Sequence, residues 1–139
     1  MYIAIVLTDE SKDKLKEKYR VPWGWEDIYH HVTIVMGNKM NDFPFSIGEK
    51  VEFEATEYGV CYGFDLPMKK RPKKAELDTH LATAVKVKLP EGKYVKNENP
   101  HVTLQVNRQA GGKPFFSNHI TGWRPINPIQ LEGVVTLCK

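Results

Sequence analysis

A tetrapeptide that occurs twice constrains the fold of this chain more than any other feature of its sequence. His31-Val32-Thr33-Ile34 lies in the first half, and His101-Val102-Thr103-Leu104 lies 70 residues later, half the length of the 139-residue chain. Both copies open segments rich in aliphatic and β-branched residues, which predict strands over 31–36 and 101–106. Because side chains i and i+2 of a strand share a face, each histidine projects beside its threonine, and the two aliphatic residues point to the core.

Several other segments have the length and residue types of strands, whereas helical patterns are few. Strands are expected over 2–7, 51–56, 58–64, 82–89 and 131–137, with 58–64 as the hairpin partner of 51–56. A charged helix is expected over 12–19, with Thr8, Asp9 or Ser11 as its N-cap and Pro22 as its stop. One helical turn is expected over 117–123.

This ratio of strands to helices predicts an α+β fold with mostly antiparallel sheet. A length of 139 residues fits one domain, and no linker is long enough to separate two. We therefore expect a single domain over 1–139 with a small bilobal architecture, its lobes covering roughly 1–75 and 76–139. If a pseudo-twofold axis relates these halves, the two histidines and the two threonines meet in one central cleft.

Composition excludes several classes of protein. Hydrophobic residues make up 41% of the chain and charged residues 27%, which argues against disordered and low-complexity structure. No apolar run approaches the roughly 18 residues that a membrane span needs. Cys61 and Cys138 are too few for a disulfide framework, so we expect reduced thiols in a cytoplasmic protein. The net charge of +3 permits a nucleotide or nucleic-acid partner without requiring one.

The paired histidines and threonines suit chemistry on a phosphodiester. One neutral imidazole can take a proton from water or from a ribose hydroxyl, and the other, as an imidazolium, can protonate the leaving oxygen. The hydroxyl groups of Thr33 and Thr103 can donate hydrogen bonds to the non-bridging oxygens. His31 and His101 are therefore the candidate catalytic residues, in a mechanism that needs no metal ion and no other cofactor.

Paired His-x-Thr-aliphatic motifs, one on a strand in each half of a small α+β chain, resemble those of the 2H phosphoesterase superfamily. The second motif, with Asn99 and Pro100 before its histidine, is similar to the family's second half, whereas the first lacks the proline and doubles the histidine as His30-His31. The resemblance implies a metal-independent phosphodiesterase that acts on RNA ends or nucleotides with a 2′,3′-cyclic phosphate or a 2′-5′ linkage. We expect the protein to bind such an RNA end or cyclic nucleotide as its substrate and to be a monomer. We do not expect it to bind a membrane.

His30 and Trp25, which precede the first motif, are candidates for contacts that support substrate binding or catalysis. Strand alternation puts His30 on the opposite face from His31, where it either packs in the core or orients a neighbouring group. Trp25 follows a glycine that lets the loop expose it, so it is a candidate for stacking on a base. Trp23 and Trp25 also suit ordinary core packing.

Two later segments carry cations that suit phosphate groups. Lys113, after two glycines, can reach a phosphate, and Ser117 or Asn118 can meet a base or a ribose, although this segment also fits a plain hairpin turn. The basic run over 69–74 is either a solvated loop or a patch that attracts phosphates.

Other interpretations of the two motifs belong to different classes. The same histidine pair would also serve a hydrolase of 3′-5′ cyclic oligonucleotide signals. In a non-catalytic RNA- or nucleotide-binding module, the motifs would hold phosphate without turnover, and the 69–74 run would anchor RNA in a salt-dependent way. The motifs would also suit ordinary strands with satisfied histidines. A metal site is disfavoured, because each motif offers one good ligand and no carboxylate.

Overall fold

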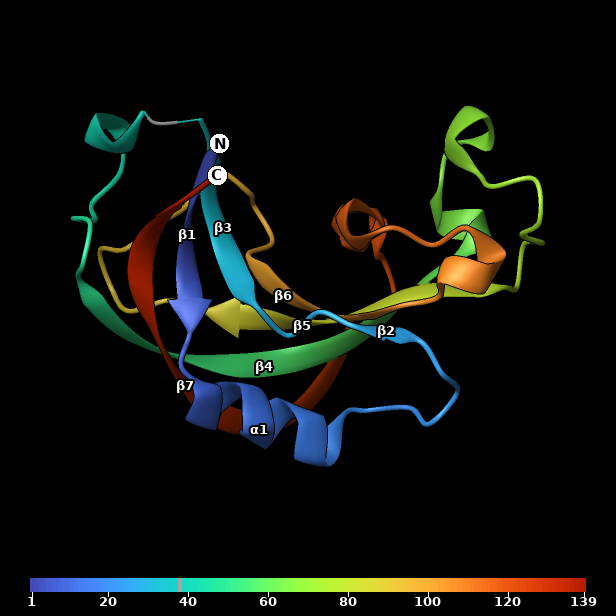
Figure 1. Cartoon of the computed structure of the whole chain (residues 1–139), viewed down its shortest axis with the longest axis horizontal. Helices are drawn as coiled ribbons and strands as arrows, with labels where there is room; N and C mark the ends of the chain where they lie inside the picture. The colour runs from blue at the N-terminus through green and yellow to red at the C-terminus, as the bar shows by residue number, and fades with distance from the viewer. Residues whose placement is uncertain (38) are drawn as a thin grey trace.

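Strands dominate the structure, a computed structural model that describes residues 1–37 and 39–139 (Figure 1). The strands are β1 (Tyr2–Leu7), β2 (Glu26–Asp27), β3 (His31–Met36), β4 (Lys50–Tyr62), β5 (His80–Lys88), β6 (His101–Val106) and β7 (Arg124–Cys138). The helices are α1 (Asp9–Lys18) and the short 3-10 helices η1 (Met40–Asp42), η2 (Gly63–Asp65), η3 (Met68–Lys70), η4 (Arg108–Ala110) and η5 (Pro114–His119). The expected α+β class with few helices is confirmed.

The strands form one sheet that closes on itself. Its order is β3-β1-β7-β4-β5-β6, and β6 pairs both with β5 and with β3, which completes the ring. Every pairing is antiparallel, as expected from the sequence. The short strand β2 lies end to end with β3 along the same edge of β6. The side chains of the main core come from α1, from loops and from every strand of the ring, so the ring and the core form one unit.

Helix α1 covers β7 and begins earlier than the sequence indicated. The Thr8 side chain accepts a hydrogen bond from the Ser11 backbone N–H at 3.2 Å, which caps the first turn. Asp9 and Glu10 therefore lie in that first turn, where negative charge favours the helix dipole. Leu15 is fully buried and anchors the helix on the sheet.

Strands β4 and β7 are longer than the sequence patterns predicted. The hairpin expected between 51–56 and 58–64 is wrong, because 51–56 and residues 58–62 belong to the single strand β4, and Gly63 and Phe64 lie in η2. A register shift between Ala55 and Glu57 resets the inside–outside alternation there, which made one bent strand look like two. Strand β7 begins at Arg124 rather than at residue 131, and the helical turn expected over 117–123 lies at 114–119 instead.

Both strands that carry the repeated tetrapeptide have a bulge at the same place. Residues Ile3 and Ala4 of β1 face Val35 and Thr33, so Ile34 is the extra residue of β3. In β6, Leu104 is the extra residue in the same way, opposite β5. Both bulged residues are fully buried, so each bulge turns an additional side chain into the core directly after the threonine.

None of the helices within the described residues is long and apolar enough to cross a membrane.

Candidate functional site

The repeated tetrapeptides are brought together by one antiparallel contact between β3 and β6. Val32 pairs with Val102, and both side chains are fully buried. In an antiparallel pair this register sets His31 across from Thr103, and Thr33 across from His101. Because strand neighbours alternate between faces, these four polar side chains lie on the face opposite the two valines.

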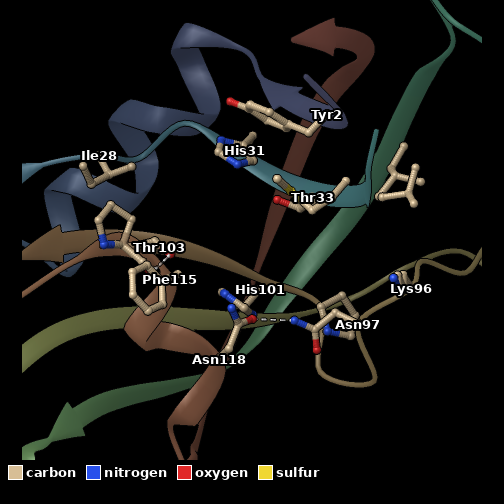
Figure 2. Close-up of a pocket in the computed structure, with 15 residues that line it drawn as sticks. Tyr2, Ile28, His31, Thr33, Lys96, Asn97, His101, Thr103, Phe115 and Asn118 are labelled. Carbon is tan, nitrogen blue, oxygen red and sulfur yellow. Dashed lines mark hydrogen bonds between the residues drawn. The ribbon is translucent and has the colours of Figure 1, made fainter. Parts of the chain in front are cut away.

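All four side chains line one cavity of about 610 Å³. His31 and Thr33 reach it from the β3 side, and His101 and Thr103 from the β6 side (Figure 2). Such a volume lies in the range of small-molecule sites, about 300–1,000 Å³. The remaining wall is contributed by Tyr2, Ile28, Ile34, Val35, Met36, Lys96, Asn97, Pro100, Pro114, Phe115 and Asn118.

A backbone carbonyl orients the imidazole of His101. Its Nδ1 lies 2.9 Å from the Asn99 carbonyl oxygen, which can only accept a hydrogen bond. Nδ1 therefore carries the proton in the neutral ring, and Nε2 has the free lone pair. The loop before the strand is tied in turn, because Asn97 accepts from the Asn99 N–H at 2.9 Å and donates to Asn118 Oδ1 at 2.7 Å.

At His31, the imidazole of His30 contacts Nδ1 in the way that the Asn99 carbonyl contacts Nδ1 of His101. The Nδ1 atoms of His30 and His31 lie 3.0 Å apart, so one of them donates and the other accepts. The Tyr2 ring packs on the His31 ring with centroids 5.1 Å apart. Nε2 of His31 is left for other partners, as in His101. His30 thus contacts His31 directly, even though adjacent strand positions normally point to opposite faces.

Burial makes both cavity histidines weak bases in the free protein. Desolvation, with smaller contributions from the charges of His30 and His101, lowers the pKa of His31 to about 4. Desolvation also lowers the pKa of His101, although its hydrogen bond to the Asn99 carbonyl acts in the opposite direction. Both imidazoles are therefore neutral at pH 7 when the cavity holds no anion.

The two threonines differ in their surroundings. The hydroxyl group of Thr103 donates to Ser117 Oγ at 3.0 Å, and Ser117 is almost fully buried behind it. Ser117 was a candidate for contact with a base or ribose, but it does not line the cavity and instead orients the hydroxyl group of Thr103. Thr33 lies on the opposite wall of the cavity, on strand β3 (Figure 2).

Two other sequence candidates lie outside the cavity lining. Trp25 packs edge-on against Trp23, with ring centroids 5.6 Å apart, and does not line the cavity. Lys113 is exposed, with its Nζ 5.8 Å from the centre of the Phe115 ring. Of the residues in its segment, Phe115 and Asn118 are the ones that reach the cavity together with Pro114.

Several cavity residues were not predicted from the sequence. Lys96 and Asn97 precede the second motif by a few residues, and this proximity was a signal that could have identified them. Tyr2 enters because β1 pairs antiparallel with β3, which sets the start of β1 against the end of β3. That pairing is a long-range property, and no local pattern of residues shows it.

The cavity has the groups for acid–base chemistry on an anion. Within the residues that the structure describes, no three His, Cys, Asp or Glu side chains are grouped so that they could hold a metal ion. No protein-family model matches the chain, and searches of curated proteins and of solved structures gave no significant match.

Proposed function

We propose that this protein is a metal-independent phosphodiesterase of the 2H type, which hydrolyses 2′,3′-cyclic phosphates or 2′-5′ linkages of nucleotides or RNA ends. The observation that carries the proposal is the common cavity of His31, Thr33, His101 and Thr103. Two imidazoles, each with Nδ1 engaged and Nε2 available, face two hydroxyl groups across a space of nucleotide size.

The reaction assigns one proton transfer to each imidazole. A water molecule attacks phosphorus, and the neutral imidazole removes its proton through Nε2. The bond between phosphorus and one ribose oxygen breaks, and the second imidazole, as a cation, protonates that oxygen. The product is a phosphate monoester with a free ribose hydroxyl. Thr33 donates a hydrogen bond to a non-bridging oxygen as charge develops on it. Thr103 does the same once its hydroxyl proton turns from Ser117 Oγ to the phosphate, and the Ser117 hydroxyl group can then donate to Thr103.

Substrate binding lets one imidazole take up from solution the proton that the acid requires. Both histidines are neutral in the free protein because burial lowers their pKa values. A phosphate anion between them favours the charged form of an imidazole and raises its pKa. Binding therefore takes up one proton, and the resulting pair of one neutral and one charged ring is the state required for catalysis.

The other lining residues suit the rest of a nucleotide. Tyr2 and Phe115 give aromatic surfaces for a base, and Phe115 is half-exposed. Lys96 is exposed beside the cavity, and its backbone N–H donates to the Ile34 carbonyl at 3.0 Å, which holds this residue against the bulge of β3. Its ammonium group is placed to interact with a phosphate.

We also propose that a pseudo-twofold axis relates the two halves of the chain, with the cavity at the axis. The strand order supports this, because exchanging β1 with β5, β3 with β6, and β4 with β7 leaves the closed ring unchanged. The bulges after Thr33 and Thr103 support it as well. The last strand of each half pairs with the first strand of the other half, β4 with β5 and β7 with β1. Each half therefore contributes one strand to the sheet of the other half.

The test is incubation with 2′,3′-cyclic mononucleotides, followed by chromatographic separation of the 2′- and 3′-phosphates. We expect turnover with a bell-shaped pH dependence, undiminished by EDTA. A parallel panel with 3′-5′ cyclic oligonucleotides and with RNA carrying a cyclic end separates the two hydrolase hypotheses. Complete loss of activity with EDTA would contradict the metal-free mechanism. Binding without turnover of any member of the panel would favour the non-catalytic module.

A further inference from the structure

A row of aromatic rings lies on the surface, away from the cavity. Phe64 stacks on Tyr62 with ring centroids 5.0 Å apart and an interplanar angle of 8°. Tyr62 meets His80 edge-on at 4.7 Å, and His80 lies 6.3 Å from Trp23. We call these four residues the aromatic row. None of them lines the cavity described above.

The ends of the aromatic row are open to solvent. Trp23 is 60% exposed and Phe64 is 55% exposed, so neither ring is a core residue. Exposed apolar side chains are common singly, but a contiguous set of large ones marks an interaction surface. The rings come from three parts of the chain: the loop before β2, the end of β4 with η2, and the start of β5.

A lysine-rich loop packs beside the aromatic row. The loop over 66–79 returns to η2, where the Phe64 N–H donates to the Leu77 carbonyl at 2.9 Å. Arg71 Nε donates to the Gly63 carbonyl at 2.9 Å, which holds the middle of the basic run next to Phe64. This loop carries five basic residues against two acidic ones, Glu76 and Asp78. Four exposed lysines belong to it: Lys69, Lys70, Lys73 and Lys74.

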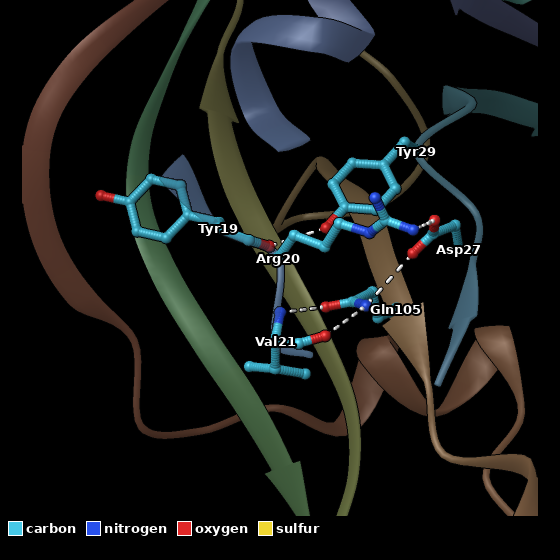
Figure 3. A network of polar contacts seen from close by, with 6 residues as sticks. All are labelled: Tyr19, Arg20, Val21, Asp27, Tyr29 and Gln105. Carbon is cyan, nitrogen blue, oxygen red and sulfur yellow. Dashed lines mark hydrogen bonds and ion pairs between the residues drawn. The ribbon is translucent and has the colours of Figure 1, made fainter. Parts of the chain in front are cut away.

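The loop that presents Trp23 is held at both ends. Gln105, which is 1% exposed, accepts from the Val21 N–H at 2.8 Å and donates to the Val21 carbonyl at 3.2 Å (Figure 3). The same amide group donates to Asp27 at 3.1 Å, and Asp27 pairs with Arg20 at 2.8 Å. Because the loop is fixed before any ligand arrives, ordering it on binding costs little entropy.

We propose that the aromatic row and the lysine-rich loop form a binding surface for single-stranded nucleic acid, separate from the cavity. Stacked and edge-on aromatic rings accept successive bases of any sequence, and nearby lysines follow the phosphates. Duplexes keep their bases stacked inside the helix and do not suit this surface. The combination of exposed rings and unbalanced positive charge selects a polyanion with accessible bases over an acidic protein.

The position of this surface relative to the cavity fits one strand that reaches both. Strand β6 carries His101 at one end and Val106 at the other, where Asn107 donates to the His80 carbonyl at 2.9 Å. Five residues of a strand cover about 17 Å. The loop before β2 and the lysine-rich loop lie at the same end of the closed sheet (Figure 1). Nucleic acid bound there would increase the local concentration of its end near the cavity.

The experiment uses fluorescence anisotropy at low salt to measure the binding of a labelled ten-nucleotide oligouridylate. Its 3′ end carries a free hydroxyl group, so the probe has no cyclic phosphate for the cavity to hydrolyse. We expect Trp23→Ala and Phe64→Ala each to weaken binding at least about fivefold, because each removes a stacking partner. Tyr94→Ala is the matched control, since Tyr94 is 57% exposed and lies outside the aromatic row. Thermal unfolding of each variant verifies that the fold is retained.

The charged half of the surface has its own control. Lys69→Ser with Lys70→Ser should weaken binding and reduce the slope of log K against log salt by about 1.4, at roughly 0.7 for each phosphate contact. Lys88→Ser with Lys139→Ser removes the same charge from two exposed positions, Lys88 at the end of β5 opposite to His80, and should leave that slope nearly unchanged. Equal effects of the two double variants would mean that only net charge attracts the probe.

Binding measurements on variants of the two cavity histidines separate this proposal from the proposed phosphodiesterase activity. His31→Ala and His101→Ala should bind the oligonucleotide as the unaltered protein does, whatever their turnover. The proposal is overturned if the probe fails to bind, if Trp23→Ala and Phe64→Ala bind it unchanged, or if a duplex of the same length binds equally well. Binding to anionic vesicles in preference to the oligonucleotide would also overturn it.

Discussion

The two candidate catalytic histidines differ in the group that holds Nδ1. A backbone carbonyl accepts from His101, and this group cannot change its protonation state. The imidazole of His30 faces His31 and can either donate or accept. The tautomer of His101 is therefore fixed by the fold, whereas that of His31 depends on a titratable neighbour. We therefore propose that His30 is a positioning residue that acts through His31.

Replacement of either cavity histidine should remove most of the activity. His31→Ala and His101→Ala should each lower kcat on 2′,3′-cyclic mononucleotides by about 10²–10⁴, the usual contribution of one general acid or base. His119→Ala is the control, because this histidine does not line the cavity. Turnover of either cavity variant at the level of the control would mean that the assignment is wrong.

His30→Ala should have a smaller effect with a distinct signature. Loss of the contact with His31 should lower kcat about fivefold, the value of one hydrogen bond of about 1 kcal/mol. The pKa of His31 should rise, since His30 contributes both burial and charge that lower it. The limb of the pH–rate profile that reports His31 should therefore move to higher pH: the acidic limb if His31 is the base, the basic limb if it is the acid. A uniform loss of rate without that shift would indicate damage to the fold rather than lost positioning.

At the scale of elements, short strands with a regular pattern were predicted well, and irregular ones were not. The strands at 2–7, 31–36 and 101–106 match their predicted bounds, because each is a compact run of aliphatic residues between clear stops. The register shift in β4 and the polar first half of β7 broke the alternation on which such predictions depend. Strand β2 has two residues, too few for any period.

The turn after β6 offers a test of close backbone packing. A Cβ atom on Gly112 would collide with the carbonyl oxygen of Leu81 and would lie 2.8 Å from that of Asn107. Gly112→Ala should therefore destabilise the protein by about 1–3 kcal/mol, as overpacking commonly does. Gly122→Ala should change stability by less than about 0.5 kcal/mol, since nothing lies within 4 Å of its added Cβ.

Urea unfolding of the two glycine variants measures this difference. Equal midpoints for Gly112→Ala and Gly122→Ala would show that the turn can shift to accept a methyl group.

For the whole molecule, burial of His31 links stability to pH. Its pKa is about 4 in the folded protein, below the usual value of 6.5. Well above pH 6.5 the ring is neutral in both the folded and the unfolded protein, so its titration does not change the free energy of unfolding. As the pH falls from about 6.5 to about 4, the unfolded chain binds a proton that the folded chain does not, so stability decreases. Between pH 7 and pH 5, this loss is on the order of 1–2 kcal/mol.

Urea unfolding at pH 7 and pH 5 isolates this contribution when the protein is compared with His31→Gln. The unaltered protein should lose more stability between the two pH values than the variant does, whatever the variant's stability at pH 7. Parallel losses would show that His31 is protonated equally in the folded and unfolded states.

The arrangement of the whole molecule was less predictable than its parts. The repeated motif led to the two histidines and two threonines, because a chemical pattern repeated on two strands is visible in one sequence. The lining by Tyr2, Lys96 and Phe115 depends on which strands and loops become neighbours, and local pattern carries no such information. Trp25 and Lys113 were selected for their chemistry alone, and their loops direct them elsewhere.

The location of β7 in the interior of the sheet has a consequence for biosynthesis. This strand is inserted between β1 and β4, which precede it by many residues. Until it leaves the ribosome, both of those strands keep an unpaired backbone edge, and such edges invite contact with other nascent chains. The sheet therefore closes in a late step, and chaperones that shield strand edges should matter most during that interval.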